Sequence, residues 1–178
     1  NDLWIGAPFL GCSVASSRQR AMSGGWRITY VRPLVKRIER GFVSRSSVGI
    51  GLLGMGVVGG GVVAALRQKR DQLIELIGCP AELKGVLVRD TARPRAHQIS
   101  ASLLTTNAEE ILDNPDVDIV VEVMGGQDPA LDYILKGVSM GRHIVTANKE
   151  VMARHGPDIL TMARKKGVQV LFEAAVAG

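Results

Sequence analysis

The feature that most constrains this chain is the glycine-rich stretch VGIGLLGMGVVGGG at residues 48–61. The apolar run from Val48 to Leu53 is followed by the motif Gly54-x-Gly56-x-x-Gly59. After the motif, apolar residues recur at largely helical spacing. A strand, a tight turn and a helix N-terminus in this order are typical of a dinucleotide-binding site. The first glycine turns the chain, the second lets backbone approach a pyrophosphate, and the third lets helix and strand pack closely. The pattern predicts a phosphate-binding turn formed by Gly54, Met55, Gly56, Val57, Val58 and Gly59.

Two other interpretations of these glycines exist. Gly49-x-Gly51-x-x-Gly54 fits the same motif, and glycines this dense could form a flexible hinge. The later motif is favoured because a strand-like run precedes it, whereas only Phe42 and Val43 precede the earlier one.

From Ser47 onward, strand-like and helix-like segments alternate, which is typical of a parallel sheet with helical crossovers. The strands are expected at 48–53, 86–88, 117–123, 143–146 and 168–172. The helices are expected at 57–77 with Gly78 and Pro80 as the stop, 106–112 with a Thr106–Glu109 capping box, 128–141 with Asp128 as cap, and 157–167 opened by Pro157. The sequence therefore predicts an α/β, doubly wound parallel sheet, a Rossmann-like dinucleotide-binding domain over residues 47–178.

Composition limits the number of domains and the functional classes that are possible for this chain. With 178 residues and 46% hydrophobic composition, one core is expected and two full domains are not. The net charge of +5 comes from residues 1–46, an irregular basic extension that is either a targeting presequence or, as favoured here, a segment outside the folded unit. Nucleic-acid binding through this extension is a weaker alternative, since only 4% of residues are aromatic. Two isolated cysteines and the lack of a long apolar run lead us to expect a cytoplasmic protein without membrane spans.

The residue after the second strand normally reads the ribose of the dinucleotide. Here that residue is Arg89, followed by Asp90, Arg93 and Arg95. Guanidinium groups match phosphate oxygens, so NADP is favoured as cofactor. The alternatives are that Asp90 serves NAD, or that the arginines belong to a solvated loop.

Two further strand ends carry candidate residues. Gly125 and Gly126 would let backbone pass close to the nicotinamide ribose, although an ordinary loop has the same spacing. Lys149 follows the fourth strand and could hold a carbonyl or carboxylate or shuttle a proton, although a lone lysine is usually a surface charge.

Taken together, Gly54-Met-Gly-Val-Val-Gly-Gly-Gly61, Glu122-Val-Met-Gly-Gly126, Val145-Thr-Ala-Asn-Lys149 and Phe172-Glu-Ala-Ala-Val-Ala-Gly178 resemble homoserine dehydrogenase over residues 47–178. The resemblance implies NAD(P)-dependent interconversion of L-homoserine and L-aspartate 4-semialdehyde in threonine and methionine biosynthesis, by a protein that is a homo-oligomer when complete. It also implies that Lys149 is an active-site lysine. By the same match, Glu173, Val176 and Gly178 surround a structural sodium ion; a cap or a hydrogen-bonded carboxylate is the other interpretation of Glu173.

In that family, Gly178 falls at the crossing into a substrate and dimerisation domain. The expectation is that these 178 residues bind dinucleotide but do not reduce the semialdehyde, because hydride transfer needs the substrate held against the nicotinamide. Two alternative functions are kept open. One is another NAD(P)-dependent dehydrogenase with the same first domain, and the other is a non-catalytic dinucleotide-sensing module that would tolerate loss of Lys149.

Overall fold

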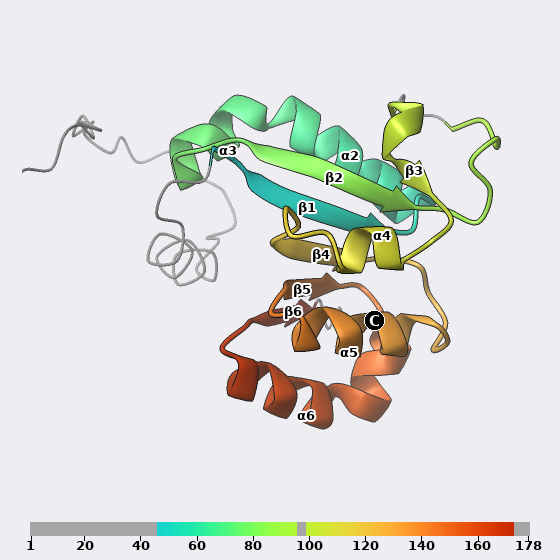
Figure 1. Ribbon diagram of the computed structural model, residues 1–178, viewed down its shortest axis with the longest axis vertical. Helices are drawn as coiled ribbons and strands as arrows, with labels where there is room; N and C mark the ends of the chain where they lie inside the picture. The colour runs from blue at the N-terminus through green and yellow to red at the C-terminus, as the bar shows by residue number, and fades with distance from the viewer. Residues whose placement is uncertain (1–45, 96–98, 173–178) are drawn as a thin grey trace, which may run out of the picture.

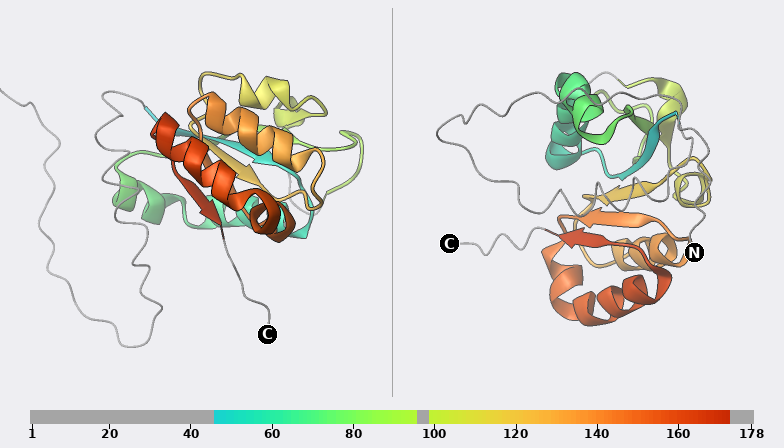
Figure 2. Two further views of the ribbon diagram at one scale, coloured as in Figure 1. Left: turned by 90° about the horizontal axis from the view of Figure 1, so that it is seen from below. Right: turned by 90° about the vertical axis from the view of Figure 1, so that its left-hand side faces the viewer.

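The computed structural model describes residues 46–95 and 99–172. They form one parallel six-stranded sheet in the order β3-β2-β1-β4-β5-β6, with helices on both faces (Figures 1 and 2). The strands are β1 (Val48–Leu53), β2 (Ala81–Leu87), β3 (Leu104–Thr105), β4 (Ile119–Glu122), β5 (His143–Thr146) and β6 (Val170–Phe172). The helices are α2 (Val57–Gln68), α3 (Arg70–Ile77), the 3-10 turn η1 (Ala101–Leu103), α4 (Glu109–Leu112), α5 (Ala130–Ser139) and α6 (Lys149–Lys166). The predicted doubly wound α/β architecture is confirmed.

The core is divided by the sheet into two apolar clusters. Successive strand residues point to opposite faces, so Leu52 packs with Val63 of α2 on one face. Its neighbour Leu53 packs on the other face, in the cluster to which α4, α5 and α6 contribute. Every residue of β1 is buried, as expected for a central strand covered on both sides.

The glycines inside β1 serve packing. Gly51 pairs with Gly85 on β2, and a Cβ at Gly51 would lie 2.4 Å from Cγ2 of Ile111. A Cβ at Gly85 would lie 2.7 Å from Cγ1 of the same side chain. These two glycines therefore let α4 sit directly on the sheet. The earlier of the two motifs lies within the strand, and the turn begins at Gly54.

The predicted helix over 57–77 is interrupted. Lys69, with φ −103° and ψ 18°, separates α2 from α3. The break was not predicted because no glycine or proline marks this position. The two helices differ in burial, since α2 buries residues against the sheet and α3 buries none. The predicted stop is confirmed, since Gly78 is left-handed with φ +84°.

Two strand predictions were incomplete. The strand predicted at 86–88 begins earlier, at Ala81. Its first half gives no continuous apolar signal, because it is only partly buried and carries Glu82 and Lys84, which form a salt bridge at 2.8 Å. The two-residue strand β3 was not predicted at all, so the sheet has six strands where five were expected. The strand predicted at 143–146 is confirmed.

Three helix starts were predicted wrongly. Pro157 lies inside α6, which begins eight residues earlier at Lys149 and is capped by the Asn148 side chain. Asp128 does not cap α5, whose N-cap is Pro129 without a side-chain hydrogen bond. At α4, the side-chain oxygen that accepts the Glu109 N–H, at 3.0 Å, is Oδ1 of Asn107, so the Thr106 capping box does not form.

The predicted basic extension, residues 1–46, lies outside the described residues except for Ser46. Within the described ranges, no helix is both long enough and apolar enough to cross a membrane.

Candidate functional site

The turn between β1 and α2 has the geometry of a phosphate-binding loop. Gly54 adopts φ +105°, a left-handed conformation that favours glycine. A Cβ at Gly59 would lie 2.2 Å from the carbonyl oxygen of Gly54, so only glycine permits this approach of helix to strand. A Cβ at Gly56 would meet no atom within 4 Å, which leaves the backbone open on that side. Gly54 and Gly59 thus provide the turn and the close helix–strand approach predicted for them, and the pyrophosphate contact at Gly56 stays a prediction.

The N-terminus of α2 is open to an anion. Gly56 is the N-cap, no side chain caps the helix, and no acidic residue lies in its first turn. The first N–H groups of a helix and its positive dipole end attract phosphate. Val57 is 95% exposed and Val58 is also exposed, whereas Met55 packs on the apolar cluster beneath.

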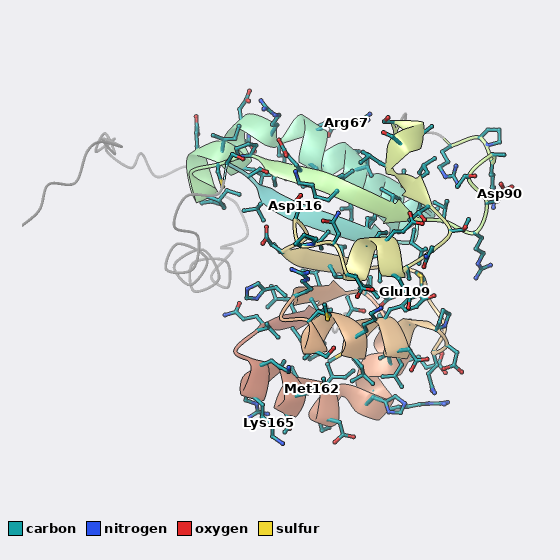
Figure 3. All side chains as sticks on the ribbon, in the orientation of Figure 1. Arg67, Asp90, Glu109, Asp116, Met162 and Lys165 are labelled. Carbon is teal, nitrogen blue, oxygen red and sulfur yellow. The ribbon has the colours of Figure 1, made fainter. Side chains whose placement is uncertain are left out.

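The loop after β2 carries the arginines. Arg89, Asp90 and Arg93 are exposed, and Figure 3 shows Asp90 on the loop beyond the carboxyl end of β2. The Arg95 guanidinium donates to the carbonyl oxygens of Thr91, Arg93 and Asp90 in its own loop, with that of Arg93 at 2.7 Å. Oδ1 of Asp90 accepts the Ala92 N–H at 2.9 Å. Arg95 therefore shapes the loop, and Arg89 and Arg93 stand on its exposed surface.

The loop after β4 carries two consecutive left-handed glycines. Gly125 and Gly126 both have φ +76°, and a Cβ at either would meet no atom within 4 Å. The loop is anchored at its base by Glu122, whose buried Oε1 accepts the Met124 N–H at 2.8 Å. The predicted glycines thus form an open backbone surface.

Lys149 is the first residue of α6, directly after the loop that leaves β5, and it is exposed. A cation at a helix N-terminus is opposed by the helix dipole. Three other basic residues of α6, Arg164, Lys165 and Lys166, lie in its last turn, where the dipole favours them, and Arg154 is paired with Glu150 at 3.6 Å. The charge of Lys149 therefore does not stabilise the start of α6.

The sheet order brings these segments together. The loops that carry Arg89, Gly54–Gly59, Gly125–Gly126 and Lys149 follow β2, β1, β4 and β5, which are consecutive neighbours in the sheet. From β1 the chain proceeds outward through β2 and β3 and then returns to β4 on the other side, so the topological switch point lies between β1 and β4. Ligands of open α/β sheets bind at such a point, at the carboxyl ends of the strands.

Three residues that join these loops were not predicted as site residues: Glu122, Thr146 and Asn148. The signal available in the sequence was a carboxylate that ends an otherwise apolar strand. The predicted sodium set, Glu173, Val176 and Gly178, lies outside the described residues. Within 46–95 and 99–172, no cluster of three or more His, Cys, Asp or Glu side chains could hold a metal ion.

Comparison with known proteins gives a consistent result. Residues 54–173 match the family model "Homoserine dehydrogenase, NAD binding domain". The chain is 48% identical over 134 residues to a homoserine dehydrogenase of Synechocystis and 40% identical over 132 residues to that of Bacillus subtilis, in each case over 74% of this chain and 30% of the relative. This chain thus spans about a third of the length of these curated relatives.

Solved structures agree. A crystal structure of S. aureus homoserine dehydrogenase superposes with a TM-score of 0.70 and 36% identity, over 75% of this chain and 35% of that one. A homoserine dehydrogenase from Thiobacillus denitrificans gives a TM-score of 0.66 and 38% identity, over 72% and 30% of the two chains.

Proposed function

This chain belongs to the homoserine dehydrogenase NAD-binding domain family, and we propose that it forms the dinucleotide-binding part of a homoserine dehydrogenase. The observation that carries the proposal is the alignment of four loops along neighbouring strand ends, with Gly56, Gly125 and Gly126 open to a ligand. In this proposal the complete protein interconverts L-homoserine and L-aspartate 4-semialdehyde.

The residues of the chain fit a dinucleotide. The N–H groups of the first turn of α2 would bind the diphosphate, since no side chain caps them and Gly56 leaves the approach clear. The absence of a carboxylate from that turn supports the same assignment. Gly125 and Gly126 would leave room for the nicotinamide ribose.

NADP is proposed as the preferred cofactor. The exposed Arg89 follows β2 at the position that reads the ribose, and a guanidinium suits a 2′-phosphate. The carboxylate of Asp90, the competing candidate for an NAD ribose, already accepts a backbone N–H of its own loop. These two observations support phosphate recognition over recognition of a 2′-hydroxyl.

Lys149 is proposed to act on the substrate. When bound, the nicotinamide supplies or accepts the hydride. Lys149 would hold the substrate's carbonyl oxygen or carboxylate and transfer a proton at the alcohol oxygen, as its exposed position beside the nicotinamide loop permits. We further propose that the 178-residue chain binds dinucleotide without turnover, because it spans about 30% of its relatives' length.

Calorimetric titration of the 178-residue chain with NADPH and NADH tests the cofactor assignment. We expect tighter binding of NADPH, and Arg89→Ala should weaken it by about tenfold or more while changing NADH affinity little, because one charge-assisted contact is lost. Lys165→Ala removes a cation at the far end of α6 (Figure 3) and should change neither affinity. Tighter binding of NADH that is insensitive to Arg89→Ala would reject the NADP assignment.

A further inference from the structure

A fully buried carboxylate lies at the carboxyl end of β4, next to the proposed cofactor site. Glu122, the last residue of β4, is 0% exposed and sits between Leu53 of β1 and Thr146 of β5. Glutamate is almost never fully buried unless it is paired. Among the described residues, the hydrogen-bond donors to this carboxylate are both neutral groups.

Each oxygen of Glu122 holds a different loop. Oε1 accepts the backbone N–H of Met124 at 2.8 Å, at the base of the glycine loop. Oε2 accepts the Thr146 hydroxyl at 2.5 Å, and the Thr146 oxygen in turn accepts the Asn148 N–H at 2.9 Å. One carboxylate thereby fixes the loop after β4 and the loop after β5.

Asn148 closes the network. Its side-chain amide donates to the carbonyl oxygen of Gly126 at 2.6 Å, and its Oδ1 accepts the Val151 N–H at 3.2 Å and so caps α6. The residue that follows is Lys149. The glycine loop and the start of α6 are therefore tied to each other directly through Asn148 and indirectly through Glu122 and Thr146.

We propose that Glu122 is a positioning residue for the nicotinamide half of the dinucleotide: its carboxylate sets the spacing between the Gly125–Gly126 loop and Lys149. This inference rests on the proposed function, because it takes the dinucleotide to lie along both loops. Both oxygens of the carboxylate accept a hydrogen bond. In Glu122→Gln, an amide whose oxygen stays on the Met124 N–H turns its NH2 group toward the Thr146 oxygen, so the Thr146 hydroxyl loses its acceptor and must reorient.

The test compares ligands that reach this end of the site with ligands that do not. We measure dissociation constants of NADPH and adenosine 2′,5′-bisphosphate, and of NADH and ADP, for the wild-type 178-residue chain and for Glu122→Gln. For the preferred dinucleotide we expect about tenfold weaker binding to Glu122→Gln, which is the size of effect that one lost hydrogen bond produces. Binding of the corresponding adenosine ligand should be unchanged.

A second pair of variants keeps the test decisive if Glu122→Gln does not fold by circular dichroism. Thr146→Val removes the hydroxyl with little change of shape and should show the same selective loss, whereas Thr146→Ser keeps the hydroxyl and should bind as wild type. Thr161→Val, in the exposed middle of α6, is the matched control and should have no effect.

Equal weakening of the dinucleotide and the adenosine ligand would show a general structural role and overturn the inference, as would equal affinities of Thr146→Val and Thr146→Ser. If the folded wild-type chain binds neither dinucleotide, the proposed function itself fails. If the wild type binds and Glu122→Gln binds equally well, only the role of Glu122 fails.

Discussion

At the scale of single residues, two glycines in α2 differ in what surrounds them. Gly59 faces the carbonyl oxygen of Gly54, where a Cβ would approach to 2.2 Å, and backbone cannot easily give way. Gly61 is exposed in the same helix, and a Cβ there would meet no atom within 4 Å. The first glycine is required by packing and the second is not.

We therefore expect opposite effects of the same substitution. Gly61→Ala should raise the free energy of unfolding by about 1 kcal/mol, since alanine favours helix over glycine. Gly59→Ala should lower it by about 1–3 kcal/mol through overpacking and should also weaken dinucleotide binding, because the turn is displaced. Urea unfolding and calorimetry of both variants provide the measurement; effects of the same sign on stability would contradict this view of the turn.

Lys149 gives a second prediction at this scale. In the complete protein, Lys149→Ala should lower kcat by about a hundredfold or more, the range for a lost proton-transfer group, with a smaller effect on dinucleotide affinity. Steady-state kinetics with L-homoserine and a separate binding titration give the two values. Full turnover by Lys149→Ala would instead favour a lysine without a chemical role.

At the level of the elements, the first half of β2 contains a contact whose strength depends on pH. The hydrogen bond from Lys84 and a second one from Ser47 lower the pKa of Glu82 from its ordinary value of 4.5. A lowered folded-state pKa means that this contact contributes stability above the unfolded-state pKa and loses it as the pH falls through the folded-state value.

Glu82→Gln should therefore lower the free energy of unfolding at neutral pH, where the carboxylate is ionised, and this difference from wild type should shrink as the pH falls below about 4.5. The effect should stay below about 1 kcal/mol because the pair is largely exposed. Thermal unfolding of wild type and variant between acid and neutral pH measures it. An unchanged difference between the two proteins across that range would rule out a contribution from Glu82.

Element prediction succeeded where the local signal was strong and unopposed. The strand 48–53 and the following turn were predictable because an apolar run and a glycine motif coincide there. The start of β2 was missed because the charged residues Glu82 and Lys84 lie in its partly buried first half. The start of α6 was missed because Pro157 is a stronger local signal than the Asn148 cap, although the helix accommodates the proline in its interior.

At the scale of the whole molecule, the candidate site is a product of strand order. Sequence motifs could predict Gly54, Arg89 and Lys149 separately, because each follows a predicted strand. The network of Glu122, Thr146 and Asn148 could not be predicted, since it depends on the pairing of Glu122 with Thr146 across β4 and β5. Contacts of this kind become visible only when the register of the sheet is known.

We propose that a dinucleotide binds along the carboxyl ends of β2, β1, β4 and β5, with its diphosphate at the N-terminus of α2. The most direct measurement is a titration of the isotopically labelled 178-residue chain with NADPH and NADH, followed by the chemical shifts of assigned backbone amides. We expect the largest changes in the turn 54–59, with further changes at 89–90, 124–126 and 147–149. Changes that are confined to other surfaces of the folded chain, or no changes at saturating dinucleotide, would contradict dinucleotide binding at these strand ends.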